Sequence, residues 1–199
     1  GEAVTRAILA AVLKAIRAWD EANIVMPVVA INMALEQFSD SAKVEELKWA
    51  VDSYDILPAR IAFEIDEKIF QTDGESTISN NLRHMIDNGF KLYLDDFGTG
   101  HIDRGMLRAL NISRVKIDRA FVANIDSDGE QQSVTAELIA HAHECKIKTI
   151  AEGVETPAER LMLQRLGCDG IQGFLIAEPM SFDIASRWLS NHSFSIRAS

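Results

Sequence analysis

Two hydrophobic patterns alternate along the chain: short apolar runs and longer stretches with helical periodicity. The first periodic stretch, residues 3–19, places Ile8, Val12 and Trp19 on one face and predicts an amphipathic helix. Apolar runs typical of buried parallel strands lie at 28–32, 61–66, 91–97, 114–118, 148–153 and 170–173. Helical patterns lie between them, near 41–54, 75–88, 103–110, 130–145, 157–166 and 181–190. This alternation of strands and helices predicts an α/β sheet or barrel.

A polar residue stands near the C-terminal end of each predicted strand. These residues are Asn32, Glu64, Asp95 with Asp96, Lys116, Glu152 and Gln172. In a TIM-type barrel the C-terminal ends of all strands meet at one rim, which carries the active site. An open doubly wound sheet concentrates its chemistry at a single switch point. The pattern therefore predicts a TIM-like (β/α)8 barrel that lacks about two N-terminal strands. No linker divides residues 1–199, so we expect a single domain.

The rim of such a barrel would gather four carboxylates: Glu64, Asp95, Asp96 and Glu152. Burying them together is costly unless cations lie between them. Two hard divalent ions such as Mg²⁺ or Mn²⁺ would neutralise the carboxylates and suit phosphoryl chemistry. An amide oxygen of Asn32 could complete a coordination shell. Lys116 could orient a water or neutralise charge that develops on a phosphate, and Gly98 and Gly100 permit a tight loop beside a ligand.

Each of these features also has a simpler interpretation when it is taken alone. An Asp-Asp pair is most often a turn or a helix cap. A lysine at a strand end is usually a solvated tip, and the "EGVE" stretch at 152–155 is as typical of a loop as of a site. Their occurrence at one per strand–helix unit favours a metal site over these separate interpretations.

Composition and charge restrict the classes of partner. The formal net charge is −10, which argues against binding along duplex nucleic acid because phosphate binding needs a basic surface. The acidic charge does not exclude a small phosphate ligand, because divalent metal can supply the missing positive charge. Cys145 and Cys168 match no zinc spacing and indicate a reducing, cytoplasmic setting. No apolar run approaches a membrane span, so we expect no membrane contact by this domain. Trp49 and Trp188 lie in helical patterns, and we expect their side chains to pack in the core or between helices.

Six segments in this order and spacing make a specific set: "INMALEQF", "FEIDE", "LDDFGTG", "VKIDRAFV", "IAEGVET" and "LGCDGIQGFLIAEPM". With them the chain resembles the EAL domain, the bacterial phosphodiesterase that cleaves cyclic di-GMP to the linear dinucleotide pGpG. The resemblance runs over essentially the whole chain. It implies an eight-stranded barrel, two divalent cations, flanking sensor or regulatory domains and a homodimer. It is also compatible with the cytoplasmic part of a larger, membrane-attached protein.

The resemblance also implies a set of metal ligands. Asn32, Glu64 and Asp95 match the family's ligands of one metal. Asp95, Asp96 and Glu152 match those of the second, with Asp95 bridging the two. The adjacent aspartates would then form a doubly charged wall shared by two cations.

Other matches concern the water, the substrate and the loops. Lys116 matches the lysine that holds the catalytic water, and Glu67 matches a glutamate that fixes the loop after "DDFGTG". Glu155 and Gln172 match further rim positions, and Asp118 matches the "KID" aspartate, to which no role is assigned. The remaining positions expected to support the loop or the substrate are Gly98, Thr99, Gly100, His101 and Pro179.

The chain departs from the family pattern in three ways. The Glu-Ala-Leu motif, which carries a metal-binding glutamate on an early strand, is absent, so the chain is expected to be N-terminally incomplete and inactive. Glu36 and Glu178 stand where the family usually has arginines, and the loop at 101–104 is altered. These exchanges support an alternative hypothesis: a degenerate, inactive domain that serves as a cyclic di-GMP receptor or as a signalling or interaction module.

Overall fold

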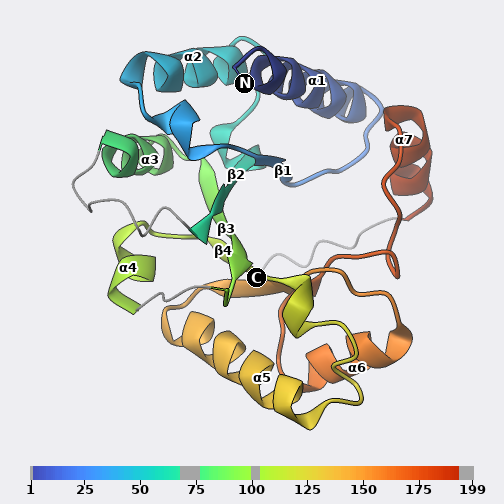
Figure 1. The fold of residues 1–199 in the computed structure, drawn as a ribbon. Helices are drawn as coiled ribbons and strands as arrows, with labels where there is room; N and C mark the ends of the chain where they lie inside the picture. The colour runs from blue at the N-terminus through green and yellow to red at the C-terminus, as the bar shows by residue number, and fades with distance from the viewer. Residues whose placement is uncertain (1, 68–76, 100–103, 193–199) are drawn as a thin grey trace.

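The computed structural model describes residues 2–67, 77–99 and 104–192, and it shows a curled parallel sheet with helices on its outside (Figure 1). The strands are β1 (Val29–Asn32), β2 (Ile61–Asp66), β3 (Lys91–Phe97), β4 (Arg114–Ile117), β5 (Lys148–Ala151) and β6 (Gly170–Ile171). The α-helices are α1 (Glu2–Glu21), α2 (Ser41–Asp52), α3 (Thr77–Asp87), α4 (Arg104–Ala109), α5 (Gly129–Glu144), α6 (Pro157–Arg165) and α7 (Phe182–Asn191). Short 3-10 helices are η1 (Leu35–Phe38), η2 (Pro58–Arg60) and η4 (Arg119–Phe121).

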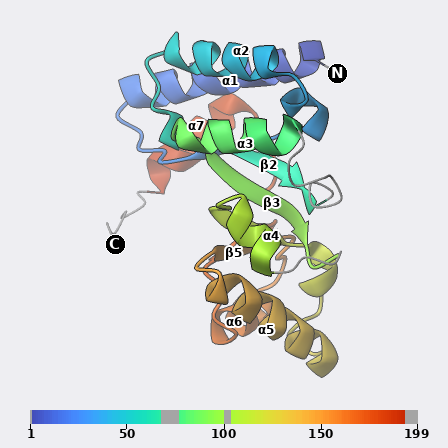
Figure 2. The same ribbon diagram turned by 90° about the vertical axis from the view of Figure 1, so that its left-hand side faces the viewer.

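The sheet has six strands in the order β1-β2-β3-β4-β5-β6, and every neighbouring pair is parallel. Each strand therefore returns through a helix on the outer face, with α1 and α2 at one end of the molecule and α5 and α6 at the other (Figures 1 and 2). All C-terminal strand ends consequently point to one edge, as a TIM-type barrel requires. The predicted TIM-like fold is confirmed, since the six strands of the described residues form a curled parallel half-barrel.

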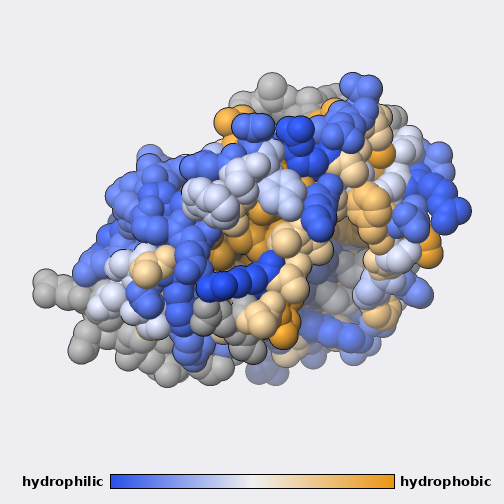
Figure 3. Space-filling model, turned by 90° about the horizontal axis from the view of Figure 1, so that it is seen from above, coloured by the Kyte–Doolittle hydropathy of each residue, from blue (hydrophilic) through white to orange (hydrophobic). Residues whose placement is uncertain are grey.

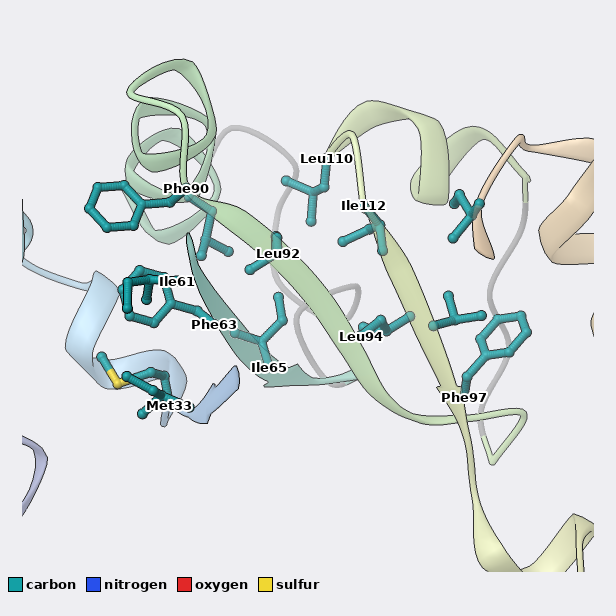
Figure 4. Packing of buried hydrophobic residues seen from close by; sticks show 14 of the residues in the cluster. Met33, Ile61, Phe63, Ile65, Phe90, Leu92, Leu94, Phe97, Leu110 and Ile112 are labelled. Carbon is teal, nitrogen blue, oxygen red and sulfur yellow. The ribbon is translucent and has the colours of Figure 1, made fainter. Parts of the chain in front are cut away.

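The core forms because the strands and the inner helix faces are apolar. In β2, residues 61–65 are all buried, as expected for a parallel strand covered on both faces. Phe63 lies at the centre of an aromatic group, with ring centroids 5.9 Å from Phe38 and 5.5 Å from Phe90. Figure 4 shows Phe63 and Phe90 within this buried packing. Burying one such side chain contributes roughly 1.5–3 kcal/mol. This packing fixes β2 and β3, which carry several of the predicted site residues.

Local signals explain where the helices begin. Asp128 accepts hydrogen bonds from the backbone N–H groups of Glu130 and Gln131 at the start of α5. Helix α6 opens with Thr156 in a capping box with Glu159, and Pro157 occupies its first position. Among the described residues, no helix is long and apolar enough to cross a membrane.

The structure corrects several details of the sequence-based expectations. The predicted strands at 148–153 and 170–173 end two residues earlier than expected, at Ala151 and Ile171. The expectation that Trp49 packs in the core is wrong, since its side chain is 74% exposed. Helix α2 buries Leu47 and Val51, and Trp49 lies two residues from each, on the opposite face of the helix.

Candidate metal centre

Strand β3 contains an irregularity at the paired aspartates. Leu94 pairs with Val115 and Phe97 with Ile117, so β3 has one more residue than β4 across this interval. Asp96 adopts a left-handed backbone conformation with φ of +55°, which costs roughly 1–3 kcal/mol and is typical of functional sites. Regular alternation would send adjacent side chains to opposite faces of the sheet. The bulge instead allows both carboxylates to reach the same rim.

Lys116 lies at the centre of the acidic rim. Its side chain is almost fully buried, and Nζ lies 3.0 Å from Glu64 Oε2, 3.2 Å from Asp95 Oδ1 and 2.6 Å from Glu152 Oε1. Three strands thus place carboxylates around one ammonium group. The lysine donates a hydrogen bond to Glu64 Oε2 and forms ion pairs with all three carboxylates, so it holds these side chains together.

The charges in this cluster perturb one another. Burial alone would lower the pKa of Lys116, but hydrogen bonds and charge interactions with Glu152 and Glu64 raise it overall, so the ammonium stays charged. Burial also raises the pKa of Glu152, and Asp95 and Glu64 add to that rise, while Lys116 opposes it. One buried cation does not balance the carboxylates around it, so further positive charge would stabilise the site.

The remaining predicted ligands lie beside this cluster. Carboxylate oxygens of Asp95, Asp96 and Glu152 lie within 4.8 Å of one another. A pocket of about 280 Å³ opens next to them and is lined in part by Asn32, Glu64, Asp95 and Asp96. Both predicted ligand groups are therefore brought together, with Asp95 in each. The donors are all oxygen atoms, which is the chemistry that suits hard divalent cations.

Comparison with known proteins agrees with this geometry. The model of the EAL domain family matches residues 1–179. The chain belongs to the EAL domain family. Cyclic di-GMP phosphodiesterase PA2567 of Pseudomonas aeruginosa is 33% identical over 171 residues, which are 86% of this chain and 29% of that protein. The relatives it matches are much longer, and the chain spans between 19% and 29% of the first of them.

Solved EAL structures share the fold. The PaMucR phosphodiesterase in complex with c-di-GMP aligns with a TM-score of 0.82 and 28% identity, covering 89% of this chain and 72% of that one. Klebsiella pneumoniae BlrP1 in a manganese and cyclic di-GMP complex aligns with a TM-score of 0.75 and 26% identity, covering 88% and 45% respectively. Divalent metal is thus present together with the dinucleotide in a solved relative.

Glu67 contacts the loop that follows β3. Glu67 is buried, and Thr99 Oγ1 donates a hydrogen bond to Glu67 Oε2 at 3.2 Å and another to the Asp96 carbonyl at 3.0 Å. Gly98 has φ of +106°, and a Cβ there would lie 2.7 Å from Leu138. Only glycine fits this conformation and spacing without strain. Gly100 and His101 lie outside the described residues.

Asp118, for which the sequence assigned no role, caps a short helix and lies near the aspartate pair. Its Oδ1 accepts a hydrogen bond from Ala120 N at 2.7 Å and so caps η4. Its charge also acts on Asp96, whose pKa is raised first by burial, then by Asp95 and then by Asp118. The residue therefore both shapes the loop after β4 and adds negative charge beside the aspartate pair.

Two links join the loops after β4 and β5. Arg119 donates to Glu155 Oε1 at 2.6 Å, and both side chains are exposed. The buried carboxylate of Glu159 accepts from Asn124 N at 3.1 Å and from Glu155 N and Thr156 N at 2.9 Å each. These loops follow directly after Lys116 and Glu152, so the links hold the two strand ends in a fixed relation.

Two predicted residues lie outside the acidic cluster. Gln172 is exposed, and its backbone donates to the Ala151 carbonyl at 2.8 Å and accepts from Val154 N at 3.0 Å. Pro179 is exposed on the segment before α7. Their roles, like those of the placed ligands, stay predictions.

Asp66 is a rim residue that sequence reasoning missed. It lines the same pocket as Asn32 and Glu64, and its charge helps raise the pKa of Asp96. The signal was present, because Asp66 follows Glu64 by two positions in β2 and successive even positions of a strand face the same side.

Proposed function

We propose that this chain is the phosphodiesterase domain of an EAL protein, which hydrolyses cyclic di-GMP to the linear dinucleotide pGpG. One observation carries the proposal: the strand ends bring an oxygen-rich ligand set together around one buried lysine. The set comprises Asn32, Glu64, Asp95, Asp96 and Glu152 around Lys116. The names of the relatives support the substrate, since PA2567 is named as a cyclic di-GMP phosphodiesterase.

The ligand set fits two divalent cations, which we propose to be Mg²⁺ or Mn²⁺. Asn32, Glu64 and Asp95 would hold one, and Asp95, Asp96 and Glu152 the other. Bound there, the cations would act as Lewis acids that activate the phosphodiester and the attacking water. Glu67, through Thr99, would keep the Asp96 backbone in the conformation that this arrangement requires.

The chain's own residues supply the rest of the chemistry. Lys116 places a permanent positive charge on the floor of the site, where it can orient the attacking water and stabilise charge on the phosphate. The carboxylate of Glu152, which belongs to the same cluster, would accept the proton of that water. The water oxygen forms a bond to phosphorus, the bond from phosphorus to the ribose oxygen breaks, and that oxygen takes up a proton. One ring opening yields pGpG.

The proposal extends to the protein around the site. Residues 1–199 would form a single, N-terminally incomplete EAL domain, because β1 pairs with β2 alone and β6 with β5 alone among the described strands. The lengths of the relatives support flanking sensor or regulatory domains in the same protein. We further propose a cytoplasmic location and a homodimer, which ultracentrifugation would test.

A second candidate function is a receptor that binds cyclic di-GMP without cleaving it. Two observations favour it: Glu36, in η1 just after β1, and Glu178 are both exposed. Negative charge at these positions would oppose the phosphates of the dinucleotide. The chain retains the whole predicted ligand set and Lys116. This favours the phosphodiesterase over the receptor, because a receptor has less need of metal ligands.

One assay separates these functions. A longer form that includes the Glu-Ala-Leu segment is incubated with cyclic di-GMP and Mn²⁺, and the products are separated by chromatography. The enzyme predicts pGpG that disappears when EDTA is added. Saturable binding of cyclic di-GMP with no product would favour the receptor and contradict the phosphodiesterase.

A further inference from the structure

The loop that follows β5 carries Glu152, a proposed ligand of the second cation, and its backbone is bonded to both neighbouring segments. On one side, Glu152 N donates to the Ile117 carbonyl of β4 at 3.0 Å. On the other side, Val154 N donates to the Gln172 carbonyl at 3.0 Å, and Leu175 N donates to the Val154 carbonyl at 3.0 Å. The segment after β6 therefore follows this loop closely, with one hydrogen bond in each direction.

Gly173 lies directly against the backbone of Val154. A Cβ at position 173 would overlap the carbonyl oxygen and the nitrogen of Val154, and it would lie 2.8 Å from the carbonyl carbon. A flexible side chain could rotate away from an added methyl group, but these three are backbone atoms, and two of them take part in the hydrogen bonds to Gln172 and Leu175. A methyl group at position 173 would therefore displace Val154 itself, two residues after Glu152.

Arg119 covers the same loop at Gly153. This glycine has φ of +68°, and a Cβ there would lie 2.5 Å from Cγ and 2.8 Å from Cδ of Arg119. The guanidinium of the arginine donates to Glu155 Oε1 at 2.6 Å. The aliphatic part of Arg119 thus packs on the residue next to Glu152, while its charged end holds the residue three positions further along.

The contact at Gly173 differs from the looser packing between α1 and α2. A cavity of about 310 Å³ lies between those helices, and Figure 3, which looks down on them, shows the hollow with hydrophobic atoms between hydrophilic side chains. A cavity can accommodate extra volume, whereas closely packed atoms transmit a displacement to their neighbours. A shift of Val154 is therefore expected to move Glu152.

The site depends on where the Glu152 carboxylate lies. Its Oε1 is 2.6 Å from Lys116 Nζ, and oxygens of Glu152, Asp95 and Asp96 lie within 4.8 Å of one another. Divalent Mg²⁺ accepts little deviation from ligand distances of about 2.0–2.1 Å. A displaced carboxylate would leave the second cation with two of its three proposed ligands.

We propose that Gly173 is a positioning residue for Glu152. It acts through the backbone of Val154 and keeps the carboxylate where the second cation would bind, and Arg119 supports the same loop through Gly153 and Glu155. The inference rests on the proposed two-cation phosphodiesterase centre. Gly173 has no side chain that could bind a cation, so its role is to place a ligand.

Binding of Mn²⁺ to the longer form of the domain tests this role, measured without substrate by electron paramagnetic resonance of the free ion. Gly173→Ala should weaken the binding of one of the two Mn²⁺ ions by about 10–100-fold, the usual cost of disturbing groups that orient a metal ligand. The other ion, whose proposed ligands are Asn32, Glu64 and Asp95, should bind as in the unaltered domain.

Gly167→Ala is the matched control. Gly167 also has a left-handed φ, of +85°, but among the described residues nothing beyond its chain neighbours lies within 4 Å of an added Cβ. The control should lose stability in thermal unfolding and keep both Mn²⁺ affinities. A merely structural role for Gly173 predicts the same result for Gly173→Ala, so equal Mn²⁺ affinities in the two variants would overturn the proposal.

A second pair of variants decides the question if Gly173→Ala does not fold. Arg119→Ala removes an exposed side chain and should weaken the same Mn²⁺ site, whereas Arg160→Ala, at an exposed position of α6, should not. Loss of a positive charge alone would strengthen cation binding, so weaker binding in Arg119→Ala reports lost positioning. Equal affinities in this pair would overturn the proposal. Absence of Mn²⁺ binding to the unaltered domain would instead contradict the two-cation centre itself.

Discussion

Replacing Lys116 with methionine tests how the acidic rim is held together in the absence of metal. Methionine keeps most of the side-chain length but removes the ammonium that contacts Glu64, Asp95 and Glu152 at 2.6–3.2 Å. Breaking a buried ion pair by removing one partner costs about 3–5 kcal/mol. The three carboxylate side chains are 10–23% exposed, so water screens part of their repulsion. We expect a loss near the lower end, about 3 kcal/mol in the free energy of unfolding.

For a domain of this size that loss corresponds to a fall in Tm of roughly 6–12 °C in EDTA. Divalent cations should restore more stability to Lys116→Met than to the unaltered chain, because they would no longer compete with the ammonium for the carboxylates. At a metal concentration one hundred times Kd, binding itself contributes about 2.7 kcal/mol. Turnover should nevertheless be lost, since the positive charge that orients the water is gone.

The assay is thermal unfolding in EDTA and in Mn²⁺, with Lys14→Met as the matched control. Lys14 is exposed on α1, and its replacement should change Tm little. The account would be refuted if Lys116→Met were as stable as the unaltered chain in EDTA. It would also be refuted if Mn²⁺ raised both Tm values by the same amount, because the lysine would then not occupy the place of the cations.

Three further predictions concern the supports of the site and the sheet. Gly98→Ala should cost about 1–3 kcal/mol in urea unfolding, because φ of +106° and Leu138 leave no room for a Cβ; an unchanged midpoint would contradict this. Glu159→Gln should lower the free energy of unfolding by about 1–3 kcal/mol, since one of the two carboxylate oxygens that accept backbone N–H bonds becomes a donor. Equal stability of the two proteins in calorimetry would show that Glu159 does not hold the two loops together. Burial raises the pKa of Asp169, but the N–H of Thr149 and other hydrogen bonds lower it overall. The ionised carboxylate therefore stabilises the folded state above the unfolded pKa of about 3.9, and this stabilisation is lost as pH falls through the lower folded pKa. Asp169→Asn should therefore reduce the change in the free energy of unfolding with pH in that acid range. If the variant and the unaltered chain lost stability equally as pH fell, the predicted contribution of Asp169 would be wrong.

The fold could be predicted largely from sequence because its signals are local. Apolar runs and helical periods located all six strands, and the polar residue at each strand end indicated the shared rim. The register could not be predicted, since the extra residue of β3 at Asp95 and Asp96 appears only when β4 lies beside it. The conformation that allows adjacent aspartates to share one site was therefore invisible before the structure.

Side-chain contacts across the barrel were also beyond the sequence. The position of Lys116 between three carboxylates depends on the curvature of the sheet, which brings β2, β4 and β5 around one point. The exposure of Trp49 was wrongly anticipated because periodicity shows which residues share a face, and a large apolar side chain was assumed to lie on the buried one. Asp66 was overlooked although its spacing from Glu64 indicated the same face.

The most direct test of the two-cation rim compares Asp95→Asn with Asp52→Asn in the longer form of the domain. Asp52 is exposed at the end of α2 and serves as a matched control. Initial rates of pGpG formation are measured at saturating Mn²⁺. The account predicts that Asp95→Asn lowers the rate by on the order of a hundredfold or more, since even residues that only orient metal ligands cost about 10–100-fold, while Asp52→Asn retains the rate. Unchanged turnover in Asp95→Asn would contradict the assignment of a shared metal ligand and with it the central claim.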